Sequence, residues 1–181
     1  MIVTISGYAG AGKTTVGRLL AKKLDFSFYC LGEMRRKMAG DRGMTIEQFN
    51  KLGEKKFFTD NMVDEYQKKI GKKEDNFVMV SRLGFHFIPK SKKIFLKTTA
   101  EEAAKRVFRD KTRRHEKYAD VKEARKKLQA REKSDIYRYK KYYKINPYDL
   151  RHYDFIVDTT RITPNQVVSK IIKFLHSETK P

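Results

Sequence analysis

A glycine-rich segment near the amino terminus has the residue types of a phosphate-binding loop. Residues 7–14 read Gly-Tyr-Ala-Gly-Ala-Gly-Lys-Thr and fit the pattern G-x-x-x-x-G-K-[ST]. Glycines let successive backbone N–H groups turn towards phosphate oxygens, and the positive end of the following helix adds to the attraction. We expect Lys13 to bridge the β- and γ-phosphates and Thr14 to offer its hydroxyl to Mg²⁺. The segment therefore predicts a site for ATP and Mg²⁺, formed by Gly7, Gly10, Ala11, Gly12, Lys13, Thr14 and Thr15.

A second set of charged residues has the spacing of one helix face. Arg131, Asp135 and Arg138 lie four and three residues apart, so a helix places them side by side. Two guanidinium groups beside a carboxylate suit a substrate that carries anionic phosphates and a sugar, because arginines stabilise charge on a phosphoryl group in transfer. A stripe of surface ion pairs would have the same spacing, so spacing alone leaves both interpretations open.

Two further groups of residues, a tyrosine cluster and the histidines, could bind nucleic acid or a metal, but their spacing does not favour either role. The tyrosines of residues 137–144, interleaved with lysines, could form a stacking surface for nucleic-acid bases. Tyr139 and Tyr143 also have the spacing of a packed helix face, and we prefer this interpretation. The four histidines are scattered without the spacing of metal ligands: His86, His115, His152 and His176.

Five short apolar runs predict the strands that must position the chemical groups, at residues 2–6, 27–30, 77–80, 94–96 and 154–157. Apolar spacing predicts four helices with both ends, at residues 33–39, 45–70, about 100–114 and about 120–143. Two further helices are predicted to begin at Lys13 and at Pro164, and Thr45 and Thr99 are the predicted N-caps. Strands that alternate with helices predict a three-layer α/β/α P-loop fold with a five-stranded parallel sheet.

The composition fits one globular domain and limits its partners. The chain has 181 residues and a formal charge of +20, and residues 105–151 alone hold 18 Lys and Arg against 7 Asp and Glu. Such a surplus makes nucleic-acid binding a possible property, although a solvated lysine surface has the same composition. The single cysteine, Cys30, excludes an internal disulfide, and no apolar run is long enough to cross a bilayer. We expect a cytoplasmic monomer without a membrane partner.

The whole chain resembles the archaeal-type cytidylate kinases and, more distantly, bacterial cytidylate and adenylate kinases. The matching segments occur in the same order and cover nearly all of the chain: residues 5–15, 32–36, 43–45, 81–83, 131–139 with Tyr143, and 153–161. The resemblance implies one P-loop kinase domain over 1–181, with an insert near 32–71 that binds the nucleoside monophosphate and a lid near 109–151.

The resemblance also implies roles for residues on the acceptor side. Gly32 and Arg36 would belong to the segment that holds the acceptor phosphate, and Arg82 would lie at the strand edge between the two substrates. Asp64 resembles an acidic position of the acceptor-binding helices. Asp135 would lie near the acceptor sugar.

Arginines of the lid region would serve the phosphoryl group and ATP. Arg106 and Arg109 resemble the arginines at the entry to the lid, close to ATP. Arg131 and Arg138 would belong to the lid itself and, with Lys13 and Arg82, would make up the catalytic set.

The chain departs from its relatives at three positions of this site. Cys30 stands where many relatives have Ser or Thr, and Ser81 replaces a common glycine. Val80 ends a predicted strand where relatives usually have Asp or Glu, a carboxylate that helps to hold Mg²⁺. Without it, Thr14 and the substrate phosphates are the visible ligands, which Mg²⁺ tolerates because it keeps several waters.

The resemblance implies the reaction ATP + NMP ⇌ ADP + NDP, with CMP or dCMP as the favoured acceptor. Two alternatives stay open. The charge of +20 and the departure at Val80 would also fit a kinase-like ATPase that associates with RNA or the ribosome. A P-loop kinase for another small acceptor is the third interpretation, although an alcohol acceptor would need a general base.

Overall fold

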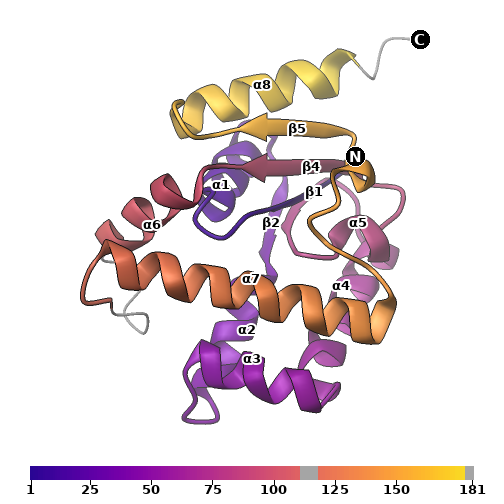
Figure 1. The fold of residues 1–181 in the computed structure, drawn as a ribbon. Helices are drawn as coiled ribbons and strands as arrows, with labels where there is room; N and C mark the ends of the chain where they lie inside the picture. Colours follow the sequence, from indigo (N-terminus) through magenta and orange to yellow (C-terminus); the bar gives the residue numbers. More distant parts are fainter. Residues whose placement is uncertain (111–117, 178–181) are drawn as a thin grey trace.

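The computed structural model describes residues 1–110 and 118–177. Its centre is a parallel sheet in the order β2-β3-β1-β4-β5 (Figure 1). The five predicted strands are confirmed to within two residues at each end: β1 (Ile2–Gly7), β2 (Ser27–Cys30), β3 (Phe77–Val80), β4 (Lys92–Lys97) and β5 (Phe155–Asp158). A parallel sheet needs cover on both faces, which is why β1, β3 and the middle of β4 are continuously buried.

Helices cover both faces of the sheet, as the predicted three-layer fold requires. Their bounds are α1 (Lys13–Leu24), α2 (Leu31–Gly40), α3 (Ile46–Lys55), α4 (Phe58–Lys73), α5 (Gly84–Phe87), α6 (Ala100–Arg109), α7 (Val121–Tyr143) and α8 (Pro164–Ser177), with a 3-10 turn at Leu150–His152. Val78 and Val80 pack with α1 and α8 on one face, whereas Phe77 and Met79 pack with α2, α3 and α4 on the other. The alternation follows from the two-residue period of a strand.

The helix predicted over 45–70 is wrong in one respect, because the chain forms two helices there. Lys56 adopts an extended conformation, with φ −122° and ψ 109°, and α4 begins two residues later. The break lets buried side chains on either side of it approach one another: a Cβ at Gly53 would lie 2.7 Å from the Thr59 hydroxyl. Neither a glycine nor a proline stands at Lys56 or Phe57, and Gly53 lies inside α3, so the local sequence does not place the break at this position.

The two predicted N-caps, Thr45 and Thr99, are confirmed by their hydrogen bonds. Thr45 and Gln48 form a reciprocal capping box, and the Thr99 hydroxyl accepts from the Glu102 N–H group at 3.2 Å. The helix predicted to reach residue 114 is α6, which ends at Arg109. Residues 111–114 and His115 are not among the residues that the structure describes.

The long helix α7 packs against both α6 and α3. In Figure 1, α7 runs across the molecule below β4 and β5, beginning beside α6 and passing above α3. Across residues 1–110 and 118–177, no helix combines the length and the apolar character needed to span a membrane.

Candidate active site

The glycine-rich loop has the backbone conformation that its sequence predicts. Gly10 and Gly12 have φ values of +80° and +82°, in a region that side-chain-bearing residues avoid. A Cβ at Gly10 would also lie 2.8 Å from Ala103, so α6 packs directly on the loop. The loop runs from the end of β1 into the first turn of α1, where free N–H groups and the helix dipole favour an anion.

Lys13 and Thr14 open α1 at the mouth of a large cavity. The Lys13 ammonium donates to the carbonyl oxygens of Gly7 at 3.0 Å and Tyr8 at 2.6 Å, so it lies over the loop where phosphates would bind. The Thr14 hydroxyl lies 3.7 Å from the Cys30 thiol. Since a thiol is a weak hydrogen-bonding partner, a hard cation could replace that contact.

The cavity beside the loop has a volume of about 1330 Å³. This exceeds the roughly 300–1,000 Å³ typical of a site for one small ligand, so there is room for two substrates. Most of the site residues predicted from the sequence line it together: Gly10, Ala11, Gly12, Lys13, Thr14, Thr15, Gly32, Arg36, Asp64, Arg82, Arg106, Arg131 and Asp135. The residues predicted for the donor side and those predicted for the acceptor side therefore face one space.

Three of the predicted site residues lie outside the cavity lining. Gly7 lies beneath the loop, where its carbonyl oxygen accepts from Lys13 and from Arg82. Arg109 is exposed at the end of α6. Arg138 is fully buried behind the cavity wall, so in this arrangement it reaches the site only through the carboxylates that it contacts.

Arg82 and Asp135 join the end of β3 to α7. The Arg82 Nε donates to the Asp135 Oδ2 at 2.9 Å, and the Tyr148 hydroxyl donates to the same oxygen at 3.2 Å. Burial raises the pKa of Asp135, but the Arg82, Arg138 and Arg131 guanidinium groups outweigh it and lower the pKa to about 2. Asp135 is therefore an ionised anchor for arginines and a poor proton acceptor.

Arg138 continues this charge pattern to α4 and α2. Its guanidinium contacts Asp135 Oδ1 at 2.5 Å and also pairs with Asp60 on α4. Asp60 in turn accepts from Arg35 at 3.0 Å. The result is a buried chain of alternating charges, Arg35–Asp60–Arg138–Asp135–Arg82, which ties β3, α2, α4 and α7 together.

The sequence analysis did not identify Arg35 and Asp60. Arg35 stands next to Arg36, and composition does not say which of the two turns inward. Arg35 is buried and donates to the Asn50 side-chain oxygen at 3.0 Å and to the Thr59 carbonyl oxygen at 2.8 Å, whereas Arg36 is only half-buried; both residues line the cavity. Asp60 had no spacing signal, because its partner Arg138 is 78 residues away in the chain.

Asp64 lines the cavity from α4 and is hydrogen-bonded in a network of neutral groups. The Tyr143 hydroxyl donates to it, as does the Gln67 amide at 2.8 Å, and the Ser81 hydroxyl donates to the Gln67 Oε1 at 2.7 Å. Burial raises the pKa of Asp64 to about 6, although both hydrogen bonds act in the opposite direction. Gln67 is a further cavity residue that the sequence analysis missed.

Two more contacts hold the phosphate-binding loop from outside. The Ala9 N–H group donates to the Glu132 carboxylate of α7 at 3.2 Å, and burial raises the pKa of Glu132. Arg106 donates to the Thr159 carbonyl oxygen at 2.6 Å, and the Thr159 hydroxyl donates to the Ala11 carbonyl oxygen at 3.2 Å. Arg106 thus braces the loop as well as lining the cavity.

The site offers few protein side chains that could bind a metal ion. Val80 is 5% exposed and packs on α1, where a Cβ at Gly17 would lie 2.7 Å from its methyl group. Among residues 1–110 and 118–177, no three His, Cys, Asp or Glu side chains are grouped closely enough to hold a metal ion. Thr14 is therefore the protein ligand that fits Mg²⁺, and phosphates and water must supply the rest.

Known proteins share both the sequence and the fold. A family model described as the cytidylate kinase-like family matches residues 2–161. A cytidylate kinase of Methanocella arvoryzae is 37% identical over 174 residues, which cover 96% of this chain and 95% of that protein. Another, of Methanosarcina acetivorans, is 36% identical over 164 residues, covering 89% and 88%. A shikimate kinase structure from Bacteroides thetaiotaomicron superposes with a TM-score of 0.67 at 16% identity, covering 97% of this chain and 98% of that one; this likeness supports the fold alone.

Proposed function

The chain belongs to the cytidylate kinase-like family, and we propose that it transfers the γ-phosphoryl group of ATP to CMP or dCMP. The observation that carries the proposal is the shared cavity. The phosphate-binding loop and the arginine-rich acceptor side line one space of about 1330 Å³, so two phosphorylated substrates can meet there. The names of the archaeal relatives favour cytidine nucleotides as acceptors.

On the donor side, the loop would hold the triphosphate of ATP. Its N–H groups and the α1 dipole attract the phosphates, and Lys13 would leave its two carbonyl partners to follow the γ-phosphoryl group. Mg²⁺, held by Thr14 and the phosphates, would neutralise charge on the β- and γ-oxygens. Arg106, and Arg109 beyond it, would approach ATP from α6.

On the acceptor side, residues 32–71 would form the monophosphate-binding insert and 109–151 the lid. Gly32 and Arg36 line the cavity from α2, where they would hold the acceptor phosphate, and Asp64 would contact the nucleoside. Arg82 and Arg131 would lie against the phosphoryl group in transfer. Because Arg138 is buried, its proposed role is to position Asp60 and Asp135 and, through Asp135, Arg82.

Proton transfer supports a monophosphate acceptor over an alcohol. An acceptor phosphate is already anionic and needs no general base, so catalysis would depend on alignment, charge neutralisation and exclusion of water. An alcohol would need a base near its hydroxyl. Among the cavity carboxylates, Asp135 has its pKa lowered to about 2 by the arginines and is poorly suited to that task. Asp64 has its pKa raised to about 6, but both of its carboxylate oxygens already accept hydrogen bonds, from Gln67 and from Tyr143.

The test is a coupled ADP-release assay across the common ribo- and deoxyribonucleoside monophosphates, with shikimate as the alcohol acceptor. We expect the highest kcat/KM for CMP or dCMP. A higher kcat/KM for another monophosphate would reject CMP and dCMP as the preferred acceptors but would still support phosphoryl transfer from ATP to a nucleoside monophosphate. Turnover with shikimate alone, or ATP hydrolysis that no monophosphate accelerates, would reject the reaction itself.

A further inference from the structure

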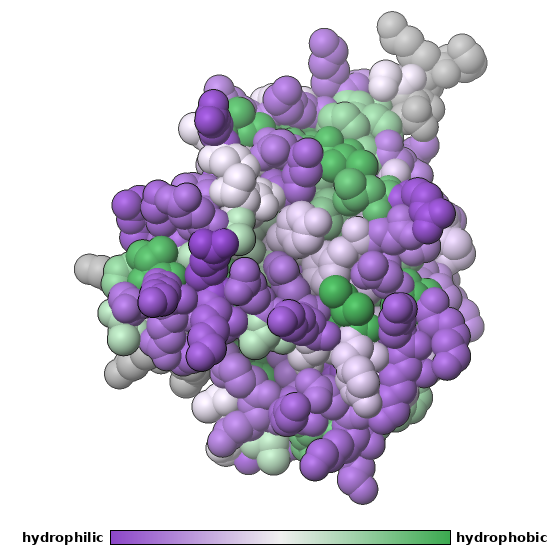
Figure 2. Space-filling model, in the orientation of Figure 1, coloured by the Kyte–Doolittle hydropathy of each residue, from purple (hydrophilic) through white to green (hydrophobic). Residues whose placement is uncertain are grey.

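The outward face of α7 carries a continuous row of exposed cations. Five lysines follow one another at four- and seven-residue steps, with an exposed tyrosine, Tyr137, in the same row. We call this row the α7 lysine stripe: Lys122, Lys126, Lys133, Lys140 and Lys144. From the first to the last lysine it spans 22 helical steps, or about 33 Å. In Figure 2, which is viewed from the side of α7, hydrophilic side chains cover most of the surface over this helix.

Acidic side chains do not neutralise the stripe. The three acids of α7 all turn inward or lie half-buried: Glu123 pairs with Lys127, Glu132 contacts the phosphate-binding loop, and Asp135 is buried with arginines. Within residues 1–110 and 118–177, none of the ion pairs includes a lysine of the stripe. An ordinary solvated helix face mixes both signs of charge, so this uniform sign is a specific feature.

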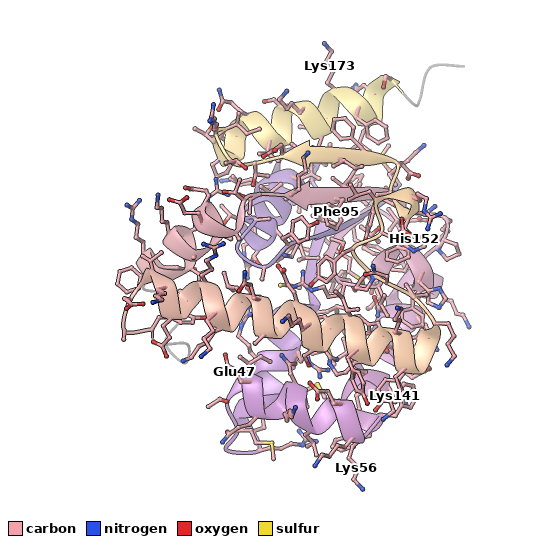
Figure 3. The ribbon with its side chains drawn as sticks, viewed as in Figure 1. Glu47, Lys56, Phe95, Lys141, His152 and Lys173 are labelled. Carbon is pink, nitrogen blue, oxygen red and sulfur yellow. The ribbon has the colours of Figure 1, made fainter. Side chains whose placement is uncertain are left out.

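One exposed aromatic ring accompanies the cations near the carboxyl end of α7. Tyr137 is 54% exposed, more than any other large hydrophobic side chain of the described residues, while Tyr139 is buried and Tyr143 packs on it. The Lys141 ammonium lies 5.9 Å from the Tyr137 ring centroid and donates to the Glu54 carbonyl oxygen of α3 at 2.7 Å. Figure 3 shows Lys141 at this junction, with Lys56 projecting nearby.

We infer that the α7 lysine stripe with Tyr137 is a binding surface for single-stranded nucleic acid. A row of cations attracts a phosphate backbone, and an exposed ring between them offers a stacking platform for a base. The length of about 33 Å corresponds to roughly ten stacked nucleotides at 3.4 Å each. A duplex keeps its bases stacked inside and would not use Tyr137, and a single exposed ring offers a membrane little apolar surface to insert. The surface faces away from the substrate cavity and does not depend on the proposed reaction.

The experiment measures binding of a fluorescein-labelled twelve-residue oligouridylate by anisotropy between 50 and 200 mM KCl. Five phosphate contacts predict a log–log slope of about −3.5 and thus a loss of affinity of about a hundredfold over this range. Replacing Lys133 and Lys140 by alanine should reduce the slope by about 1.4. Tyr137→Ala should weaken binding at least about fivefold and leave the slope unchanged.

The matched control removes the same charge from another helix. Lys170 and Lys173 are exposed on α8, and Lys173 projects from the top of the molecule in Figure 3. The double alanine variant of these two should bind within about twofold of the wild type. If both double variants weakened binding equally, net charge rather than the α7 lysine stripe would account for binding, and the inference would be overturned. Unchanged oligouridylate binding by Tyr137→Ala would overturn the assignment to single-stranded nucleic acid. The same would follow if a duplex or phosphatidylserine vesicles bound as tightly as the oligouridylate and Tyr137→Ala did not weaken that binding.

Discussion

At the scale of single residues, the site separates groups that can touch a phosphate from groups that support them. Lys13 belongs to the first kind, because it opens α1 at the cavity and its ammonium donates to two carbonyl oxygens of the loop. Arg138 belongs to the second, because carboxylates surround it and it is fully buried. Both are cations of the same predicted catalytic set, yet their replacement should have different consequences.

Lys13→Ala should abolish the chemistry and leave the fold. Loss of a cation that follows the transferred charge lowers kcat at least about a hundredfold. The two hydrogen bonds to carbonyl oxygens are worth about 1 kcal/mol each, so Tm should fall by less than about 8 °C. Steady-state kinetics and thermal unfolding check both parts. Lys22→Ala, an exposed lysine in the last turn of the same helix, should change neither, and retained turnover in Lys13→Ala would reject the site.

Arg138→Ala and Arg131→Ala should differ chiefly in stability. Removal of Arg138 leaves Asp60 and Asp135 buried with one fewer cation, which costs about 3–5 kcal/mol and lowers Tm by roughly 6–20 °C. Arg131 is only half-buried at the cavity wall, so its loss should lower kcat and shift Tm by a few degrees at most. Urea unfolding beside kinetics makes the comparison. Equal stability of the two variants would show that the buried charge chain contributes nothing to the fold.

Asp64 should make stability fall as the pH rises. Its pKa is about 6 in the folded protein and close to 3.9 in the unfolded chain, so the folded state holds the extra proton between these values. Stability from this group is therefore complete below about pH 4 and declines until about pH 6, by about 1–3 kcal/mol. Urea unfolding of wild type and Asp64→Asn at pH 5 and 7.5 tests this: the variant should gain relative stability at the higher pH. Asp75→Asn, at an exposed site, should show no such gain.

At the scale of elements, the sequence predicts what local patterns encode and misses what distant contacts impose. The strands, the loop and the caps at Thr45 and Thr99 follow from apolar runs, glycine spacing and side-chain hydrogen bonds that are local in the chain. The break between α3 and α4 does not, because it serves contacts between α4, α2 and α7. The same limit explains why the buried charge chain was seen only in part.

Gly53 offers a test of the α3–α4 junction. A Cβ there would meet the Thr59 hydroxyl at 2.7 Å, Arg35 at 3.0 Å and Arg138 at 3.1 Å. Gly53→Ala should therefore destabilise the protein by about 1–3 kcal/mol and raise KM for the monophosphate more than KM for ATP. Gly40→Ala in α2, where the Cβ would meet nothing within 4 Å, should be neutral or slightly stabilising. Equal changes in both KM values would mean that the junction does not organise the acceptor side.

At the scale of the whole molecule, charge is distributed in two ways that respond differently to salt. Buried ion pairs such as Arg138 with Asp60 are enclosed by protein and are screened little. The surplus of 42 Lys and Arg over 22 Asp and Glu is largely on the surface, where like charges repel one another across the compact state. Folding brings these cations together, so their repulsion opposes the buried pairs.

Added salt should therefore stabilise this protein. Raising KCl from 20 to 300 mM shortens the screening length from roughly 20 Å to about 6 Å, which weakens repulsion between exposed lysines more than attraction within the buried chain. We expect Tm to rise by a few degrees in KCl. The double alanine variant at Lys133 and Lys140 should start from a higher Tm at low salt and gain less, since two of the repelling charges are gone. A Tm that falls with salt would mean that exposed ion pairs, rather than surplus positive charge, dominate the electrostatics of the folded state.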